Sequence, residues 1–517
     1  MQETRIPLAN VCRTMSSFRL NRSALASAVL LFPLAAFAQY AGAKPVSDDL
    51  KKGFEAINAS DAKKWLSFLA GPECQGRGTG QPGFQKAADY VAARFKEFGL
   101  KPIGDRGTYF QGVPFVRSQM DPKVSFLSNA DGTGRMIASK NFTFGGSGDL
   151  DLAAPVVFVH ANGNAAIPSP DALKGKIVVM FADGGSVSRR LRQDLFRAEM
   201  AMMLTVAEKV GEPGWSVRRG KLADFRPGRV TGGTISLAAA KSLMKSQGVE
   251  ESFASKTLAA DTMEVGQGTK DIKISSKSKV EEVNVPNVVG LLEGSDPILK
   301  EEVVAVGSHL DHLGTDGNTI WYGADDDGSG STAVLAIAKA FSSNPIRPKR
   351  SVLFMTFCGE EMGLLGSAYY VQNPIIPLDK TQCLMQMDMV GRDSFGAQNG
   401  DQKRIDKLEE NHNTMRLVGS KRISQEYDDI IQEVNQHVGF VFKYDAEDVY
   451  TRSDHYNFAR NGVPIAFQFC GFTPDYHQPT DTVDKINFDK IANAAKLCYL
   501  TLMKVGNMDG KLKRNPG

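Results

Sequence analysis

Apolar residues in the C-terminal half of the chain alternate between short continuous runs and a helical pattern. Four runs rich in β-branched or apolar residues predict buried strands: 303–307, 351–357, 383–387 and 464–469. Between the first two, residues 331–341 have helical periodicity, with Val334, Leu335, Ala338 and Phe341 on one face. We therefore predict an α/β fold, a mostly parallel sheet with helices on both faces, in which ligands gather at the carboxyl ends of the strands.

The N-terminal part of the chain has helical patterns at residues 62–69 and 83–98, and Gly99 ends the second. The glycine-rich loop between them, residues 71–80, superficially resembles a phosphate-binding loop. It lacks both the Lys-Ser/Thr ending and the preceding strand that such a loop needs. We therefore expect no nucleotide site there.

The middle of the chain differs in texture from both ends. Residues 156–160 and 177–181 are short β runs separated by Ala, Asn, Gly and Pro, and a basic, Met-rich stretch with a helical pattern follows at 188–210. A strand beginning at Lys279 leads back into the main domain. These patterns predict a β-rich insert at 147–279 that divides one main domain into the parts 39–146 and 280–517.

The first 38 residues have the pattern of a secretory signal. Four arginines precede an apolar run at 24–37, and the run ends in the small-x-small sequence Ala36-Phe37-Ala38. The run is shorter than the roughly 20 residues that span a bilayer. We expect a start at Met1 or Met15, export to the periplasm or the medium, and no stable membrane insertion after signal removal.

Charge and cysteine content exclude several classes of function. With 61 Lys plus Arg and 58 Asp plus Glu, the net charge of +3 gives no field that would attract nucleic acid or anionic lipid. The six cysteines include no CxxC pair, and Cys12 lies in the predicted signal. We expect neither a zinc–thiolate site nor a disulfide framework, and at least one free thiol.

Zinc-binding side chains follow the predicted strands. His309, Asp311 and His312 come after the first, where an imidazole can bind zinc while a carboxylate orients the ring. Residues 325–327 are three adjacent aspartates, which repel one another unless a cation neutralises them. A calcium loop needs ligands at alternate positions and a distant Glu, and this segment lacks that pattern. Zinc is therefore the favoured cation. An acidic helix cap is the alternative without a metal.

Further acids and a histidine follow the remaining strands. Glu360 and Glu361 stand among apolar residues and glycines, so one can bind metal while the other accepts a proton from water. A buried Asp388 needs either a metal or the basic partner Arg392. Tyr476 and His477 follow the last strand. We expect these groups to share one metal site, and we assign His160, His412 and His437 to the structure or the surface.

These residues resemble the motifs of the cocatalytic-zinc exopeptidases, a family of secreted bacterial aminopeptidases, glutamate carboxypeptidase and the non-enzymatic transferrin receptor. Residues 171–179 are similar to the protease-associated domain often inserted in that family. The resemblance implies two zinc ions per chain, bound by His309, Asp388, Glu361 and His477 and bridged by Asp326. It also implies Glu360 as the general base, Asp311 orienting the first histidine, and Tyr476 stabilising the oxyanion. Residues 453–455 match a family pattern near the substrate pocket, with no metal assigned.

The family resemblance implies hydrolysis of N-terminal residues from peptides by a metal-activated water. A carboxypeptidase and a glutaminyl cyclase are alternatives within the same family. A receptor-like binding protein is an alternative of another class, although it would have substitutions at the five ligand positions. Neither the preferred terminal residue nor the oligomeric state follows from the sequence.

Overall fold

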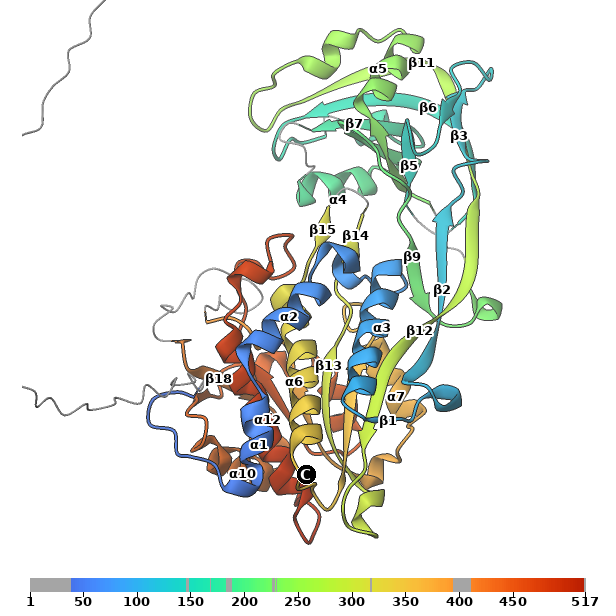
Figure 1. The fold of residues 1–517 in the computed structure, drawn as a ribbon. Coiled ribbons are helices and arrows are strands. Elements are labelled where there is room, and N and C mark those ends of the chain that lie inside the picture. Colours follow the sequence, from blue (N-terminus) through green and yellow to red (C-terminus); the bar gives the residue numbers. More distant parts are fainter. Residues whose placement is uncertain are drawn as a thin grey trace, which may run out of the picture. The chain divides into compact units, whose positions relative to one another are not determined.

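Two β-sheets, one of ten strands and one of eight, organise the chain together with a short hairpin (Figure 1). The computed structural model describes residues 39–515 except 146–147, 168, 183–187, 226–227, 229, 317–318 and 394–410. The predicted secretory signal, residues 1–38, lies outside the described residues. None of the helices within the described ranges combines the length and apolarity needed to cross a membrane.

The ten-stranded sheet has a parallel centre and antiparallel flanks. Its order is β19 (Val441–Lys443), β18 (Thr414–Val418), β20 (Ile465–Phe469), β17 (Thr381–Met387), β13 (Val303–His309), β16 (Ser351–Phe357), β12 (Ser278–Leu292), β2 (Phe110–Met120) and β9 (Ser216–Arg219), with β1 (Lys101–Pro102) beside β12. The four central strands, β20, β17, β13 and β16, pair in parallel. Outside them, β12, β2 and β9 run antiparallel to their neighbours. The prediction of a mostly parallel sheet is therefore confirmed only for these four central strands. The sheet as a whole is mixed, because strands on both sides of the centre pair antiparallel with their neighbours.

Both faces of this sheet are buried under helices, as predicted. Along β13, Val304 and Val306 pack into one apolar cluster, whereas Val303 and Ala305 pack into another on the opposite face. Because side chains alternate across a strand, this division shows that the strand is covered on both sides.

The helices fall on the two faces according to the cluster they enter. The first cluster includes residues of α1 (Asp48–Ala56), α2 (Ala59–Leu69), α3 (Pro82–Glu97), α6 (Gly330–Ser343), α10 (Gln425–Asn435) and α12 (Phe488–Gly506). The second includes residues of α7 (Leu365–Gln372) and α11 (His455–Arg460). A short α9 (Ser420–Ile423) precedes α10. The predicted helices 62–69, 83–98 and 331–341 are confirmed as α2, α3 and α6.

Helix α12 is a long element that sequence patterns did not predict. Nearly all of its residues from Lys490 to Gly506 are buried, and it packs against α6, α2 and α10. Its buried residues include Lys490, Asn493 and Lys496, so burial here does not follow the division into polar and apolar residues on which sequence patterns rest. Its first turn is capped by the side chain of Asn487, which accepts from the backbone N–H of Lys490.

The eight-stranded sheet begins earlier in the chain than the predicted insert 147–279. Its order is β4 (Met136–Ile137), β3 (Phe126–Asn129), β11 (Met263–Ser276), β6 (Leu150–Ala161), β7 (Ile177–Ala182), β8 (Met202–Ala207), β10 (Gly232–Ser236) and β5 (Phe142–Phe144). Strands β3, β4 and β5 thus lie before residue 147. Helix α5 (Leu237–Ser246) follows β10 and packs against it.

The helix predicted at 188–210 is wrong beyond its first turns. Helix α4 (Arg189–Arg197) ends well before residue 210, and Met202 begins strand β8. In β8, Met202, Met203 and Leu204 are buried, and the strand pairs in parallel with β7 and β10. Pairing between two strands has overridden the local helical pattern.

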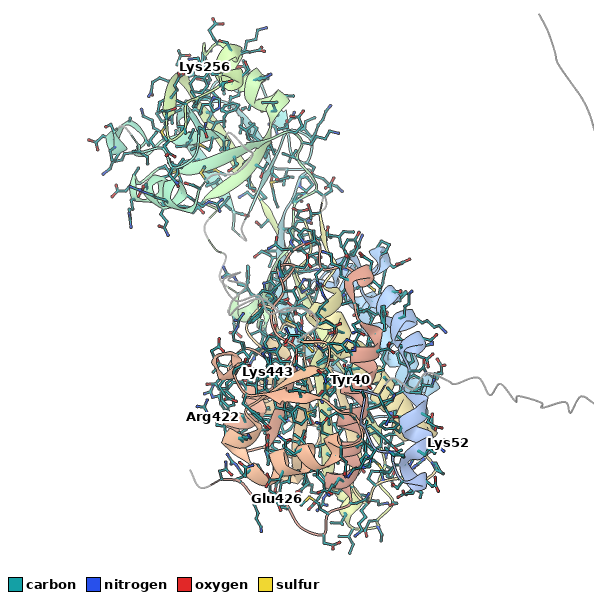
Figure 2. All side chains as sticks on the ribbon, turned by 90° about the vertical axis from the view of Figure 1, so that its left-hand side faces the viewer. Tyr40, Lys52, Lys256, Arg422, Glu426 and Lys443 are labelled. Carbon is teal, nitrogen blue, oxygen red and sulfur yellow. The ribbon has the colours of Figure 1, made fainter. Side chains whose placement is uncertain are left out.

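The surface and the cysteines agree with an apolar core and a polar exterior. Long charged side chains such as Lys52, Lys256 and Arg422 extend outward from the ribbon (Figure 2).

The cysteines at positions 74, 358, 383, 470 and 498 are all buried and free. Cys12 lies outside the described residues.

Candidate functional site

The carboxyl ends of the four parallel strands supply the side chains of one site. His309 is the last residue of β13, Asp388 directly follows β17, and Glu360 and Glu361 follow β16. Tyr476 and His477 lie in the loop after β20, and Asp326 lies in the segment Ala324–Ser329 before α6. Parallel strands end at the same edge of a sheet, so residues far apart in the chain meet there.

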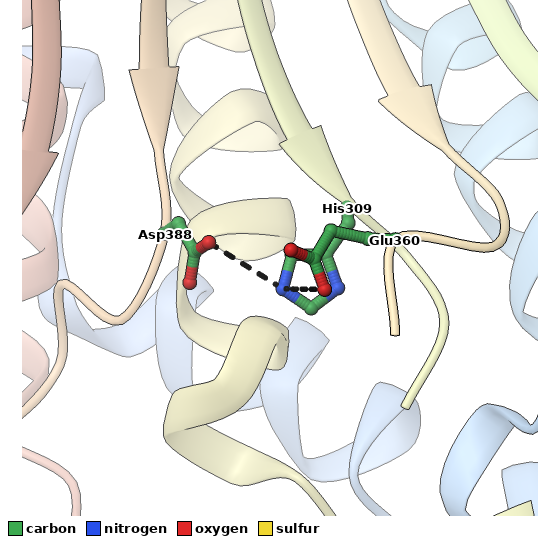
Figure 3. Close-up of side chains that lie close together, drawn as sticks. All are labelled: His309, Glu360 and Asp388. Carbon is green, nitrogen blue, oxygen red and sulfur yellow. Dashed lines mark ion pairs between the residues drawn. The ribbon is translucent and has the colours of Figure 1, made fainter. Parts of the chain in front are cut away.

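His309 is surrounded by three carboxylates. Its Nε2 lies 3.2 Å from Asp326 Oδ1 and 3.6 Å from Asp388 Oδ2. Glu360 Oε2 is 3.9 Å from the same nitrogen, and Figure 3 shows Asp388 and Glu360 beside the ring. One imidazole nitrogen therefore faces oxygen atoms from three different loops.

His477 lies on the other side of Asp326. Its Nε2 is 3.1 Å from Asp326 Oδ2 and 3.0 Å from Glu361 Oε2. The two oxygens of Asp326 thus face two different histidines, His309 and His477. This is the arrangement that a carboxylate bridging two metal ions requires.

The neighbours of Asp326 use their carboxylates differently. Asp327 accepts hydrogen bonds from the backbone N–H groups of His309 and Gly330, at 3.0 and 2.8 Å. Asp325 accepts from the N–H of Gly391 at 2.8 Å. Of the three adjacent aspartates, Asp326 is the one whose carboxylate lies nearest to His309 and His477.

His312, which the sequence grouped with the zinc-binding side chains but to which the family resemblance assigned no metal, lies in the site. It is buried, and its Nδ1 lies 2.7 Å from Glu361 Oε1 and 3.8 Å from Asp326 Oδ2. The signal that pointed to it in the sequence is its position directly after the first predicted strand, β13. Its contact with Glu361 joins two different loops, so the sequence around His312 does not predict it.

The electrostatics of the site suit a cation. Ligand atoms lie within 4.8 Å of one another in two groups, His309 with Glu360 and Asp388, and His312 with Asp326 and Glu361. Burial and the charges of Asp388 and Glu361 raise the pKa of Glu360 well above its usual range, despite the opposing effect of His309. So many buried carboxylates are costly unless positive charge compensates them, and the histidines supply only part of it. The donor set of imidazole and carboxylate fits zinc.

Asp388 is not compensated by Arg392. That arginine donates instead to Asp475, at 3.2 Å. Asp388 Oδ2 accepts from the hydroxyl of Ser453 at 2.6 Å. The basic-partner alternative for Asp388 is therefore wrong.

Asp311 is held by two residues that lie far apart in the chain, Thr79 and Glu360. Its carboxylate accepts from the Thr79 hydroxyl at 2.8 Å and from the backbone N–H of Glu360 at 3.1 Å. His309 Nδ1 lies 3.1 Å from the backbone carbonyl of Asp311 and 3.8 Å from its carboxylate. The carbonyl is thus the nearer partner of the ring, and the carboxylate anchors the segment that contains Glu360.

The glycine-rich loop, which matched no nucleotide motif, supports the site through Arg77. This side chain is fully buried and donates to the backbone carbonyls of Leu310 and Gly323, at 2.8 and 2.7 Å. It also donates to the carbonyls of Leu69 and Tyr322, at 2.8 and 2.9 Å. One guanidinium therefore links the loop of His309 to the loop of Asp326.

The remaining histidines lie away from the two groups. His160 lies in the core of the eight-stranded sheet, 3.1 Å from the carbonyl of Phe253. His412 is exposed, whereas His437 is half-buried, with its Nδ1 3.1 Å from the backbone carbonyl of Lys44. His455 is buried against the ring of Phe467, and burial lowers its pKa to about 3.

A cavity opens beside His309, Glu360 and Asp388. Its other walls are mainly apolar or aromatic, and they include Met389, Val449, Phe467, Phe469, Phe472 and Tyr476. Arg452 also lines it. A substrate side chain can therefore lie against apolar walls while its reacting bond faces the polar groups.

Part of the chain matches a known peptidase family. Residues 287–502 match the model described as "Peptidase family M28". The chain is 26% identical over 469 residues to a probable leucine aminopeptidase 2 of Aspergillus oryzae, covering 84% of this chain and 85% of the relative. Other curated relatives match shorter stretches, such as the leucine aminopeptidase 2 of Arthroderma otae, of which half is covered.

Solved structures agree on the fold. A zinc aminopeptidase of Bacillus subtilis superposes with a TM-score of 0.53 at 18% identity, over 88% of this chain and 97% of that one. The peptidase M28 precursor of Shewanella amazonensis gives 0.51 at 20% identity, over 91% and 98%. These similarities relate the chain to peptidase family M28: residues 287–502 match the family model, and the solved structures share the fold.

Proposed function

We propose that this protein is a two-zinc aminopeptidase that removes N-terminal residues from peptides. The observation that carries the proposal is the position of Asp326, whose two oxygens lie 3.2 Å from His309 and 3.1 Å from His477. His309 and Asp388 would hold one zinc, Glu361 and His477 the other, and Asp326 would bridge them. When bound, zinc supplies Lewis acidity to a water molecule and to the peptide carbonyl.

Glu360 is the proposed general base. Its carboxylate lies at the edge of the first group, 3.9 Å from His309 Nε2, and lines the cavity. Burial and the charges of Asp388 and Glu361 raise its pKa above its usual range, which favours proton uptake. Glu360 would take a proton from water and later deliver one to the leaving amine.

Tyr476 is the proposed donor to the oxyanion. Its ring stacks on that of His477, with centroids 3.8 Å apart, and it lines the same cavity as Glu360. A phenol held by a stacked neighbour loses little freedom when it donates to the developing negative charge. Asp311 would act indirectly, by fixing the His309 ring and the segment of Glu360.

Cleavage from the amino end is favoured by the curated relatives, which are named leucine aminopeptidases. A carboxypeptidase is the second candidate, because Arg452 lines the cavity and a guanidinium can grip a terminal carboxylate. Arg452 already donates to Tyr476, which makes this reading weaker. A glutaminyl cyclase and a non-catalytic receptor need fewer of these acidic side chains.

The remaining features of the proposal concern domains and location. We propose that residues 1–38 direct export, and that the main domain comprises 39–146 and 280–517. The insert 147–279 is proposed to be a protease-associated domain. Because β3 to β5 belong to its eight-stranded sheet, we propose that it begins before residue 147. Strand β9, although within 147–279, pairs in the ten-stranded sheet. Its role is open.

A substrate comparison tests the reaction. Leucine p-nitroanilide should be hydrolysed, and its N-acetylated form should not, because an aminopeptidase requires the free amine. Cleavage of the acetylated form, release of C-terminal residues from N-blocked peptides, or cyclisation of N-terminal glutamine without hydrolysis would each refute the aminopeptidase assignment.

A further inference from the structure

Arg452 contacts the side chain that is proposed to bind the oxyanion. It lies between the turn Glu447–Val449 and α11, and its Nη2 donates to the hydroxyl of Tyr476 at 3.1 Å. Its guanidinium carbon is 4.7 Å from the centre of the Phe472 ring, a cation–π distance. The rings of Phe472 and Tyr476 are themselves edge to face, 4.7 Å apart. Arginine, phenylalanine and tyrosine thus form one packed unit on the cavity wall.

The direction of this hydrogen bond is fixed by chemistry. A guanidinium has donors and no acceptor, so the Tyr476 oxygen must accept from Arg452. The phenolic hydrogen is then left for a different acceptor. Since Tyr476 lines the same cavity as His309 and Glu360, that acceptor can be the carbonyl oxygen of a bound substrate.

The charge of Arg452 also matters. Its guanidinium places a positive charge within 3.1 Å of the Tyr476 oxygen. A hydrogen bond from a cation polarises the O–H bond and strengthens it as a donor.

We infer that Arg452 is a positioning residue of the reaction, which holds the Tyr476 hydroxyl and directs its hydrogen toward the substrate carbonyl. The inference rests on the proposed function. It differs from the carboxypeptidase reading, in which the same guanidinium binds a substrate carboxylate directly. As a positioning residue, Arg452 contributes to stabilisation of the transition state. As the carboxylate-binding residue of a carboxypeptidase, it would contribute to binding of the substrate in the ground state.

A double-mutant cycle separates these roles. Arg452→Gln should lower kcat for leucine p-nitroanilide about 10- to 100-fold with little change in KM, as expected for a charged hydrogen bond that acts in the transition state. Arg452→Lys should recover part of the loss. In a Tyr476→Phe background, Arg452→Gln should have little further effect, because the hydroxyl it positions is gone. Arg460→Gln on α11, an exposed arginine over the ring of Tyr456, is the matched control and should leave both constants unchanged.

Three kinetic results would overturn the inference. These are a rise in KM with unchanged kcat, an equal effect of Arg452→Gln with and without the Tyr476 hydroxyl, and a Tyr476→Phe variant as active as the wild type. If the wild type cleaves no amino-terminal bond, the proposed function fails by itself. A crystal structure of Arg452→Gln then decides separately: a displaced or multiply placed Tyr476 hydroxyl supports positioning, and an unmoved one refutes it.

Discussion

Replacing Arg77 should damage the metal site from a distance. Arg77 contributes no ligand, but its guanidinium donates to four backbone carbonyls, those of Leu310, Leu69, Tyr322 and Gly323. Two of these lie on the loops of His309 and Asp326. Arg77→Met would leave all four buried acceptors without this donor.

The size of the effect follows from these bonds. At about 1 kcal/mol for each of the four, the loss is about 4 kcal/mol. Removing a buried cation also relieves a desolvation cost, so we expect the free energy of unfolding to fall by about 2–4 kcal/mol. Arg77→Lys can satisfy at most three acceptors, because an ammonium has three donors, and should lie in between. Zinc affinity should fall about 10- to 100-fold, as for other groups that orient metal ligands.

Urea unfolding and zinc titration of purified variants measure both quantities. Arg190→Met on α4, where the side chain is 78% exposed, is the control and should change neither. An Arg77→Met protein that unfolds at the wild-type urea concentration and binds zinc with unchanged affinity would show that this guanidinium does not hold the two loops together.

Two further predictions concern catalysis and pH. Glu360→Gln should lower the rate about 100- to 10,000-fold with its zinc content intact, and recovery of full activity after refilling a zinc-depleted variant would contradict the general-base role. In the metal-free protein, burial raises the pKa of Asp454 to about 7 and that of Asp325 to about 8, from 3.8. The folded state therefore keeps protons that the unfolded state releases, so this stability is present at low pH and is lost as the pH rises through about 7 to 8. The Tm of chelator-treated protein should fall by on the order of 5 °C between about pH 5 and pH 9, and zinc should raise it more at the higher pH. A Tm that rises over this pH range would refute the predicted loss of stability with increasing pH.

The residues at the strand ends could be predicted from the sequence, because strands and short motifs are formed by residues that are close together in the chain. Each of His309, Glu361, Asp388 and His477 follows its own apolar run, and parallel strands bring their carboxyl ends together. The family resemblance then singled out Asp326 from its neighbours. Backbone hydrogen bonds to Asp325 and Asp327 give the physical reason, which no linear pattern contains.

Supporting residues could not be read in the same way. Arg77 and Thr79 reach partners more than two hundred positions away, and Arg452 meets Tyr476 across a loop whose course is set by packing. The same applies to β8, where pairing with β7 overrides a helical pattern. Long-range contacts decide these features, and a single sequence does not record them.

Locating zinc by anomalous diffraction at its absorption edge tests the central claim most directly. The account predicts two peaks on either side of the Asp326 carboxylate, one beside His309 and Asp388 and the other beside Glu361 and His477. Zinc bound elsewhere, or an Asp326 carboxylate that touches no metal in the fully loaded protein, would contradict it.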